Sequence, residues 1–289
     1  MEAIKKFSNS GVCWWCGSKA DSNEHKIKRS VFTKFYGKGS YMNNNHRPVL
    51  VKEGKEQVLQ SSSDSRLTFA KTLCCSCNND RSSRFDLAYD TFLDYCSKNM
   101  SFLCQKGKID FEKIFGFEWK EKKYDLFRYF VKFHCGQIAT GKYQVSDEVI
   151  GFLNGDHSLN HIKVEFQIKL GILDLMEVLS IQNIDYNHIY IGATTFHGKG
   201  SDVFTLFNWF TINGFSVNLV YNLNIGKSSK YPLHDLSKKI EEIAVIDTIY
   251  PRDEVVHDFH DLIDLAENSD VNSADRFKSG LVTYILNKG

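Results

Sequence analysis

The chain is organised around the stretch Cys74-Cys75-Ser76-Cys77-Asn78-Asn79-Asp80. A second Cys-x-x-Cys pair lies upstream of it, in Cys13-Trp14-Trp15-Cys16-Gly17. Four thiolates in two pairs of this spacing are typical of a tetrahedral structural zinc site. We therefore predict one structural zinc ion held by four cysteines: Cys13, Cys16, Cys74 and Cys77.

One Cys-x-x-Cys pair would be weak evidence, because redox-active sites share the motif. Here no βαβ pattern surrounds the first pair, and the second pair follows after 57 residues, so zinc is favoured over unrelated thiols. Cys75 does not have the matching spacing and is interpreted as a packed thiol. Because zinc would hold both ends of the intervening segment at one point, its removal should unfold this part of the chain.

Length and composition indicate the number of domains and the class of protein. The 289 residues exceed the usual size of one domain, so we expect two domains. A hydrophobic content of 42% is enough for a core, and no apolar run reaches the ~20 residues of a membrane helix. No apolar segment typical of a signal peptide follows Lys5 and Lys6. We therefore expect a cytoplasmic protein that does not contact a membrane, with cysteines that are metal ligands or buried thiols.

Charge is unevenly distributed behind a net value of +1. Residues 1–110 carry 18 Lys/Arg and 11 Asp/Glu, a balance of +7, and the remaining 18 Lys/Arg and 24 Asp/Glu leave −6 in residues 111–289. A basic N-terminal part favours binding to phosphate groups, and the acidic remainder favours another kind of partner. The alternative is that the asymmetry has no function.

Three polar residues near the cysteine pairs have the chemistry that phosphodiester hydrolysis requires. Glu24 and Asn78 offer hard oxygen ligands for one Mg²⁺ or Mn²⁺ ion, which would neutralise charge at the phosphate. His25 offers an imidazole that is largely neutral at pH 7 and can accept a proton from water. Taken singly, the pair Glu24-His25 could be a surface dipeptide and Asn78 a helix cap. Their joint placement beside the cysteine pairs favours catalysis.

The same residues resemble a known family. Cys-x-x-Cys-Gly, then Glu24-His25, then a strand leading into Cys-x-x-Cys-Asn-Asn and Asp86 is similar to the HNH (ββα-metal) endonucleases. The resemblance is to the zinc-stapled branch, which includes phage endonuclease VII and bacterial defence nucleases, and it covers about the first 95 residues. It implies that Glu24 and Asn78 hold the catalytic divalent cation and that His25 is the general base. The implied partner is DNA.

The sequence departs from the commoner family pattern at two places. Glutamate stands at position 24 where aspartate is usual, and no equivalent of the middle asparagine is found where the chain reads Arg66-Leu67-Thr68-Phe69. A backbone carbonyl is a possible substitute for that asparagine in orienting His25. Asp86 is interpreted either as a structural carboxylate or as one that supports a metal ligand. For Arg81 and Arg84, phosphate contact and simple solvation are equally favoured.

Patterning predicts an α+β protein, and the resemblance implies that residues 1–105 form a zinc-stapled HNH (ββα-metal) domain. Residues 106–289 are expected to form an α+β partner-binding or regulatory domain with an antiparallel sheet. For the first part we expect a helix over 31–36, a hairpin of 48–51 with 57–59, a core hairpin of 21–30 with 66–73, and a helix after Asn78. For the second part we expect a helix over 124–140, strands at 162–170, 188–196, 203–212, 215–223 and 244–249, and helices near 234–242, 254–267 and 273–286. Asn213-Gly214 is the strongest hairpin signal in the chain.

The second domain shows no catalytic constellation. The pairs His257 with His260 and His157 with His161 are interpreted as polar surface residues, because no further ligands accompany them. The aromatic residues of 204–210 are interpreted as sheet core, since no basic residues alternate with them. An acidic, aromatic-rich domain without chemistry of its own is expected to bind a protein partner or to form a homo-oligomer.

Two functions remain. The first is a metal-dependent endonuclease acting on DNA, as the effector of a bacterial or phage defence system. The second is a catalytically inactive zinc-ribbon module that binds nucleic acid or protein. The three candidate residues favour the first, and the two departures from the family pattern keep the second open.

Overall fold

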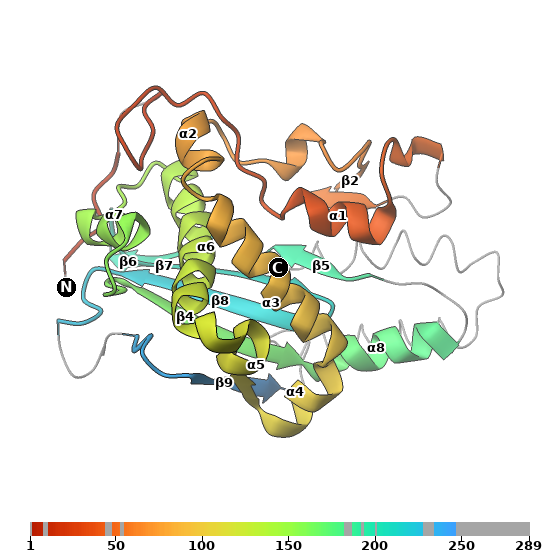
Figure 1. The fold of residues 1–289 in the computed structure, drawn as a ribbon. Coiled ribbons are helices and arrows are strands. Elements are labelled where there is room, and N and C mark those ends of the chain that lie inside the picture. Colours follow the sequence, from red (N-terminus) through yellow and green to blue (C-terminus); the bar gives the residue numbers. More distant parts are fainter. Residues whose placement is uncertain are drawn as a thin grey trace.

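The structure is a computed structural model that describes residues 2–7, 11–43, 48–52, 55–181, 187–191, 194–199, 201–227 and 234–246. It is an α+β fold, as predicted, in which helices lie across one face of a large mixed sheet (Figure 1). Among the described helices, none combines the length and apolar character that a membrane crossing requires.

The N-terminal part follows the predicted order of elements. Helix α1 (Arg29–Tyr36) ends at Gly37, whose φ of 81° favours glycine. The predicted hairpin is confirmed as β1 (Val49–Lys52) paired with β2 (Lys55–Val58). The remaining elements are η1 (Tyr41–Asn43), η2 (Ser65–Leu67), α2 (Cys75–Asn78), α3 (Ser83–Lys98) and α4 (Met100–Lys106).

The predicted core hairpin of 21–30 with 66–73 is reduced to two isolated antiparallel bridges, Ser22 with Leu73 and His25 with Thr68. A regular second strand cannot begin at Arg66, because the Asp64 carboxylate accepts a hydrogen bond from the Arg66 backbone N–H and starts the short helix η2. The chain that carries the candidate residues is therefore extended but irregular.

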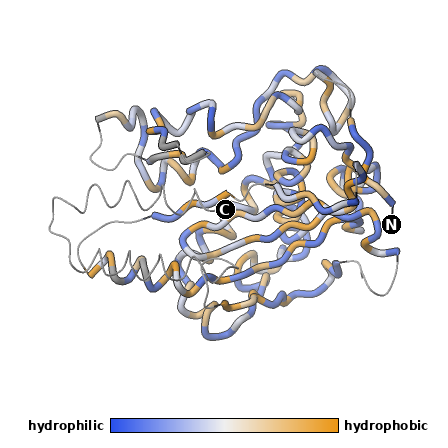
Figure 2. Tube along the Cα trace, turned by 180° about the vertical axis from the view of Figure 1, so that it is seen from behind, coloured by the Kyte–Doolittle hydropathy of each residue, from blue (hydrophilic) through white to orange (hydrophobic). Residues whose placement is uncertain are grey.

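The large sheet has the strand order β3-β9-β4-β8-β7-β5, and β6 also pairs with β7. Strands β4 and β9 run parallel, and the other neighbours are antiparallel. Apolar and polar positions alternate along the central strands, which Figure 2 shows from behind. The strands are β3 (Lys108–Asp110), β4 (Ile162–Lys169), β5 (Ile189–Ile191), β6 (Thr195–Lys199), β7 (Asp202–Ile212), β8 (Phe215–Asn222) and β9 (Ile240–Ile246).

The hairpin at Asn213-Gly214 is confirmed. It joins β7 to β8 in register from Ile212 and Phe215 outward, and both turn residues have positive φ, 46° and 82°. This conformation matches the twist of the flanking strands and is adopted most readily by Asn-Gly. The hairpin places the two longest strands at the centre of the sheet.

The prediction of a helix over 234–242 is wrong, because residues from Ile240 onward form β9. The β-branched residues Ile240, Ile243 and Val245 favour a strand, and pairing with β4 satisfies its backbone. The helices predicted at 254–267 and 273–286, and with them His257 and His260, lie outside the described residues. The segments that were not predicted include α4, β3, α5 (Phe111–Phe115), η3 (Gly116–Glu118), α7 (Asp147–Asn154) and α8 (Leu170–Ile181).

Helix α6 (Trp119–Thr140) is the longest described helix and joins the N-terminal part to the sheet. The predicted helix over 124–140 is confirmed, but α6 begins earlier and is buried on nearly all sides. Tyr129 stacks on Tyr89 of α3, and Phe130 contacts Phe166 of β4. One hydrophobic core therefore continues across the predicted domain boundary at residue 105, from Trp14 to Leu219.

Candidate functional site

The first cysteine pair lies in a tight turn. The Cys13 carbonyl accepts a hydrogen bond from the Gly17 N–H at 2.9 Å, and the Cys13 N–H donates to the Ser18 carbonyl at 2.7 Å. Gly17 has a φ of 78°, which a side chain would make unfavourable. The turn brings Cys13 and Cys16 to one side of the loop.

The second pair is arranged by the N-terminus of α2. Cys74 caps this short helix, and its Sγ accepts a hydrogen bond from the Cys77 N–H at 3.4 Å. The Asp21 carboxylate accepts from the Cys75 N–H at 2.9 Å, which ties the first segment to the second. Both cysteine pairs therefore meet at one point.

The four predicted ligands form a cluster in which all Sγ atoms lie within 4.8 Å of one another. The Cys16 and Cys74 Sγ atoms are 3.6 Å apart. A zinc tetrahedron with Zn–S bonds of about 2.3 Å has sulfur–sulfur edges of about 3.8 Å, so the spacing fits. Cys13, Cys74 and Cys77 are buried and Cys16 is exposed. The cluster can hold a metal ion such as zinc.

The surroundings affect the thiols of the cluster unequally. Arg81 places its guanidinium 3.5 Å from the Cys77 Sγ and above the Trp15 ring, and it donates to Asn154 of α7 at 2.7 Å. Burial raises the pKa of the Cys77 thiol, whereas hydrogen bonding to Ser18 lowers the pKa of Cys16 to about 6. A bound zinc ion would stabilise all four thiolates, and the guanidinium of Arg81 would offset part of their negative charge.

Cys75 lies outside the cluster, as predicted, but the interpretation as a packed thiol is wrong. Its side chain is exposed, and the Cys75 Sγ accepts a hydrogen bond from the Asn79 side chain at 3.1 Å. We expect Cys75→Ser to retain about one zinc per chain, because serine preserves this surface contact. Elemental analysis of the purified variant is the measurement. Loss of zinc from Cys75→Ser would show that the ligand assignment is wrong.

The structure brings Glu24 and Asn78 together through a lysine of α6. The Lys132 ammonium lies 3.0 Å from the Glu24 carboxylate. It donates to the backbone carbonyl of Asn78 at 3.2 Å and to the Ser82 hydroxyl at 2.8 Å. The side chain of Lys132 is only 2% exposed and that of Glu24 is 16% exposed. Burial raises the pKa of Glu24, and the ammonium opposes this effect. The pair is therefore a buried ion pair beside the cysteine cluster.

The Asn78 side chain leaves one atom without a partner. Its amide nitrogen donates to the Ser22 hydroxyl at 3.0 Å and to the Asn23 carbonyl at 3.1 Å. Its amide oxygen Oδ1 is buried and has no hydrogen-bond partner in the described structure. A buried carbonyl oxygen without a donor is costly and is a suitable cation ligand. The alternative that the Asn78 side chain caps a helix is therefore not what the structure shows.

His25 does not contact the other two candidates. Its backbone bridges Thr68, and its ring Nδ1 is buried without a hydrogen-bond partner among the described residues. Burial, and then the nearby Arg29, lower the pKa of His25, so its imidazole is neutral at pH 7. No described hydrogen bond or ion pair joins it to Glu24 or Asn78.

The carboxylate of Asp86 belongs to the same electrostatic cluster. Burial raises its pKa, while Lys132 and Lys28 oppose this effect, and its charge in turn raises the pKa of Glu24. Lys28 donates to the Asp86 carbonyl at 2.8 Å and pairs with Asp90 at 2.6 Å. Asp86 therefore supports the site and has no described bond to the cysteine cluster.

Sequence reasoning missed Lys132. It lies 54 residues after Asn78 on a helix whose pattern indicated only an apolar docking face, so no local signal pointed to it. It also left open the roles of Arg81 and Arg84. Arg81 contacts the cysteine cluster, and Arg84 forms an ion pair with Asp125 at 3.3 Å.

Comparison of the chain with models of protein families, with curated proteins and with solved structures finds no match.

Proposed function

We propose that this protein is a metal-dependent endonuclease that hydrolyses phosphodiester bonds in DNA, with its catalytic residues in the N-terminal part. One observation carries the proposal. The Lys132 ammonium lies 3.0 Å from the Glu24 carboxylate and 3.2 Å from the backbone carbonyl of Asn78, which directly follows the cluster residue Cys77 and whose side-chain oxygen is buried without a described partner. A structural zinc ion would hold α2 and the Glu24 segment in this arrangement.

In this proposal Glu24 and Asn78 hold one divalent cation through hard oxygen ligands. A bound Mg²⁺ or Mn²⁺ would supply charge neutralisation at the scissile phosphate. His25 accepts a proton from the attacking water, for which its lowered pKa keeps it unprotonated at pH 7.

DNA is favoured as the substrate because the N-terminal part is basic. Its exposed cationic side chains include Lys19, Arg29, Lys38 and Lys71, for which no ion pair is described. Such side chains bind phosphates independently of sequence and make binding dependent on salt. A role as the effector of a bacterial or phage defence system follows only from the family resemblance.

The test is nicking of supercoiled plasmid by purified protein under titrated Mg²⁺ or Mn²⁺. We expect cleavage that requires added cation and falls as salt rises. Protein carrying the His25→Ala change, prepared in parallel, controls for host nucleases. Plasmid that stays intact under both cations across pH 6–9 would contradict the proposal.

A second function is favoured by one specific observation. The Lys132 ammonium already neutralises Glu24 and contacts the Asn78 carbonyl, so a fixed cation lies next to the predicted ligands. This arrangement suits a zinc-stapled module that binds nucleic acid or protein without cleavage. In that case Glu24 is a structural residue that connects the N-terminal part to α6.

Lys132→Met tests the structural role of the pair. Removing one partner of a buried ion pair leaves a carboxylate without compensation and typically costs about 3–5 kcal/mol. We expect a loss of this size in the free energy of unfolding, measured with urea. Lys120→Met is the matched control, because Lys120 is an exposed lysine on the same helix. The double change Lys132→Met with Glu24→Gln should recover part of the loss. Equal stability of the two single variants would contradict a structural role.

The same variant separates the two functions. If Glu24 is a metal ligand, removing the competing ammonium should lower the Mg²⁺ concentration needed for half-maximal nicking. If the site is only structural, neither wild type nor Lys132→Met should cleave at any Mg²⁺ concentration. Only variant protein that remains folded at the assay temperature can be compared.

A further inference from the structure

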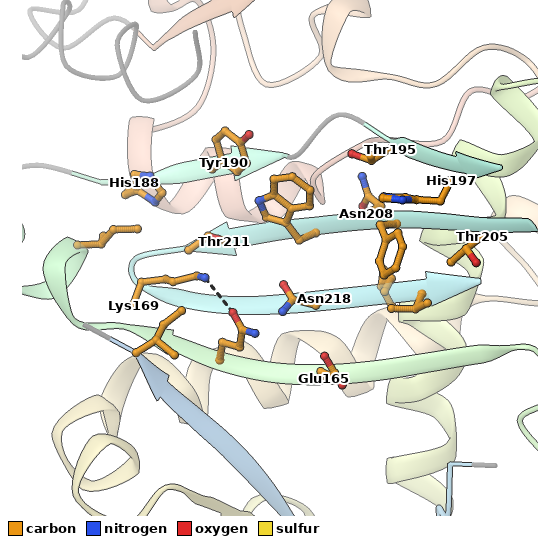
Figure 3. Close-up of a pocket in the computed structure, with 17 residues that line it drawn as sticks. Glu165, Lys169, His188, Tyr190, Thr195, His197, Thr205, Asn208, Thr211 and Asn218 are labelled. Atoms are coloured by element: carbon orange, nitrogen blue, oxygen red, sulfur yellow. Dashed lines mark hydrogen bonds between the residues drawn. The ribbon is translucent and has the colours of Figure 1, made fainter. Parts of the chain in front are cut away.

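The face of the large sheet opposite α3 and α6 carries a cavity of about 670 Å³ (Figure 3). Volumes of this size are typical of small-molecule sites. On β4 the core side is formed by Phe166 and its alternate neighbours, which contact α6, whereas Glu165, Gln167 and Lys169 line the cavity. The cavity is therefore separated from the cysteine cluster by the sheet and the helical layer.

Strand register arranges the floor of the cavity in rows. Glu165, Asn218 and Trp209 lie directly opposite one another across β4, β8 and β7. The next row places Gln167, Ser216, Thr211 and Tyr190 across four strands. The floor thus combines amide and hydroxyl groups with aromatic rings. Amides and hydroxyls can form hydrogen bonds with the edge of a heterocycle, and aromatic rings can stack on its face.

Lys169 provides a cation that no described carboxylate neutralises. Its side chain is nearly buried and donates to the neutral Gln167 amide oxygen at 2.8 Å, as the dashed line in Figure 3 shows. Burial lowers the pKa of Lys169 to about 8, so the amine is still mostly protonated at pH 7. The neighbouring acid, Glu165, is paired with Lys163 at 2.6 Å. A buried ammonium of this kind favours an anionic ligand.

The aromatic part lies across the sheet from Lys169, on β5 and β7. The rings of Tyr190 and Trp209 are nearly parallel, with centroids 6.0 Å apart, and Trp209 is only partly buried. Gln167 accepts the hydrogen bond of the Lys169 ammonium. Trp209 lies two strands away from Gln167 and two residues further along the strand direction, so the two backbone positions are about 12 Å apart by ordinary strand geometry. This separation suits a ligand with a flat ring at one end and an anionic group at the other.

We propose that the cavity binds a nucleotide, with its phosphate at Lys169, its base against Trp209 and the edge of its base at Asn218. Inorganic phosphate would leave the aromatic end unused, and a nucleoside would leave the ammonium without an anion. The site is independent of the proposed nuclease activity, because none of its residues belongs to the N-terminal part.

The experiment is calorimetric titration of the full-length protein with AMP, GMP, CMP, UMP and ATP, without added divalent cation. We expect at least one nucleotide to bind with a dissociation constant below about 1 mM. Inorganic phosphate and the matching nucleoside should each bind at least about tenfold more weakly, since each lacks one half of the contacts. Absence of binding by all five nucleotides, or equal binding of phosphate alone, would overturn the proposal.

Nucleotide binding by substituted proteins tests whether the nucleotide occupies this cavity. Lys169→Met should weaken nucleotide binding about tenfold or more, whereas Lys120→Met should change it less than about twofold. Lys120 is the control, because it is exposed, has no described ion pair and does not line this cavity. If Lys169→Met does not fold, Asn218→Asp replaces it, since it keeps the side-chain size and adds a repelling charge. Unchanged binding in a folded Lys169→Met or Asn218→Asp variant would refute the assignment.

Discussion

Cys74→Ser is expected to abolish the stoichiometric zinc and to unfold the N-terminal part of the chain. Cys74 is both a predicted ligand and the cap of α2, so serine removes a thiolate from the cluster and changes the start of the helix that carries Asn78. Structural zinc in small domains contributes apparent free energies of about 10–16 kcal/mol, and the loss of one ligand forfeits a large part of this.

The packing around the cysteine cluster indicates which residues should lose their structure when zinc is lost. Trp14, Trp15 and Leu73 are buried next to the cysteines and belong to the same core as the rest of the molecule. Their positions depend on the two cysteine pairs, because isolated bridges and single backbone hydrogen bonds, and no regular strand ladder in the described structure, join residues 11–28 to residues 68–74. Loss of zinc should therefore expose both tryptophans, while the large sheet retains its own backbone pairing.

Three measurements check this expectation. Elemental analysis should show about one zinc per chain in wild type and in Cys75→Ser, and well below that in Cys74→Ser. Tryptophan emission should shift to the red, and amide exchange should accelerate in residues 11–80 but not in β7 and β8. A Cys74→Ser protein with full zinc and unchanged exchange would show that Cys74 is not a ligand.

His25→Ala is expected to reduce plasmid cleavage by about 10²–10⁴-fold, the usual contribution of a general base. The His25 ring has no described bond to Glu24 or Asn78, so metal affinity and DNA binding should remain close to wild type. His157→Ala is the matched control, since that imidazole is exposed and belongs to α7's neighbouring loop. Wild-type cleavage by His25→Ala would exclude this mechanism.

The pH dependence should report the same group. The neutral imidazole is the active form of a base, and burial lowers the pKa of His25 from its ordinary value near 6.5. Cleavage should therefore be constant near pH 7 and fall only on the acid side, below about pH 6. A rate that falls already between pH 8 and pH 7 would point to a different base.

Changes to the predicted metal ligands should behave differently from His25→Ala. Glu24→Ala and Asn78→Ala each remove an oxygen ligand, so the cation concentration needed for cleavage should rise. Glu24→Asp is more informative, because shortening the side chain also lengthens the contact with Lys132. Loss of cleavage would indicate that the site requires the longer side chain of glutamate at position 24. Retained cleavage would indicate that the site also accepts aspartate, the usual residue of the family.

The amino-acid sequence by itself determined the cysteine cluster, the central hairpin and the α+β class. These features depend on local chemistry: Cys-x-x-Cys spacing places two thiolates in one turn, and Asn-Gly adopts the positive φ of a tight hairpin turn more readily than other dipeptides. The helix after Asn78 and the apolar face of α6 also follow from periodicity within a single segment, whereas the burial of the polar side of α6 depends on its tertiary neighbours.

Tertiary structure alone decided the rest. The strand β9 exists because β4 offers it a paired edge, which overrides the helical pattern expected for 234–242. Lys132 reaches Glu24 only because α6 packs on α3, and Lys169 faces the cavity with Trp209 only because β4, β8 and β7 lie side by side. Such contacts join residues that are between 40 and 108 positions apart, and the side-chain pattern of one segment carries no information about the partner that another segment brings to it.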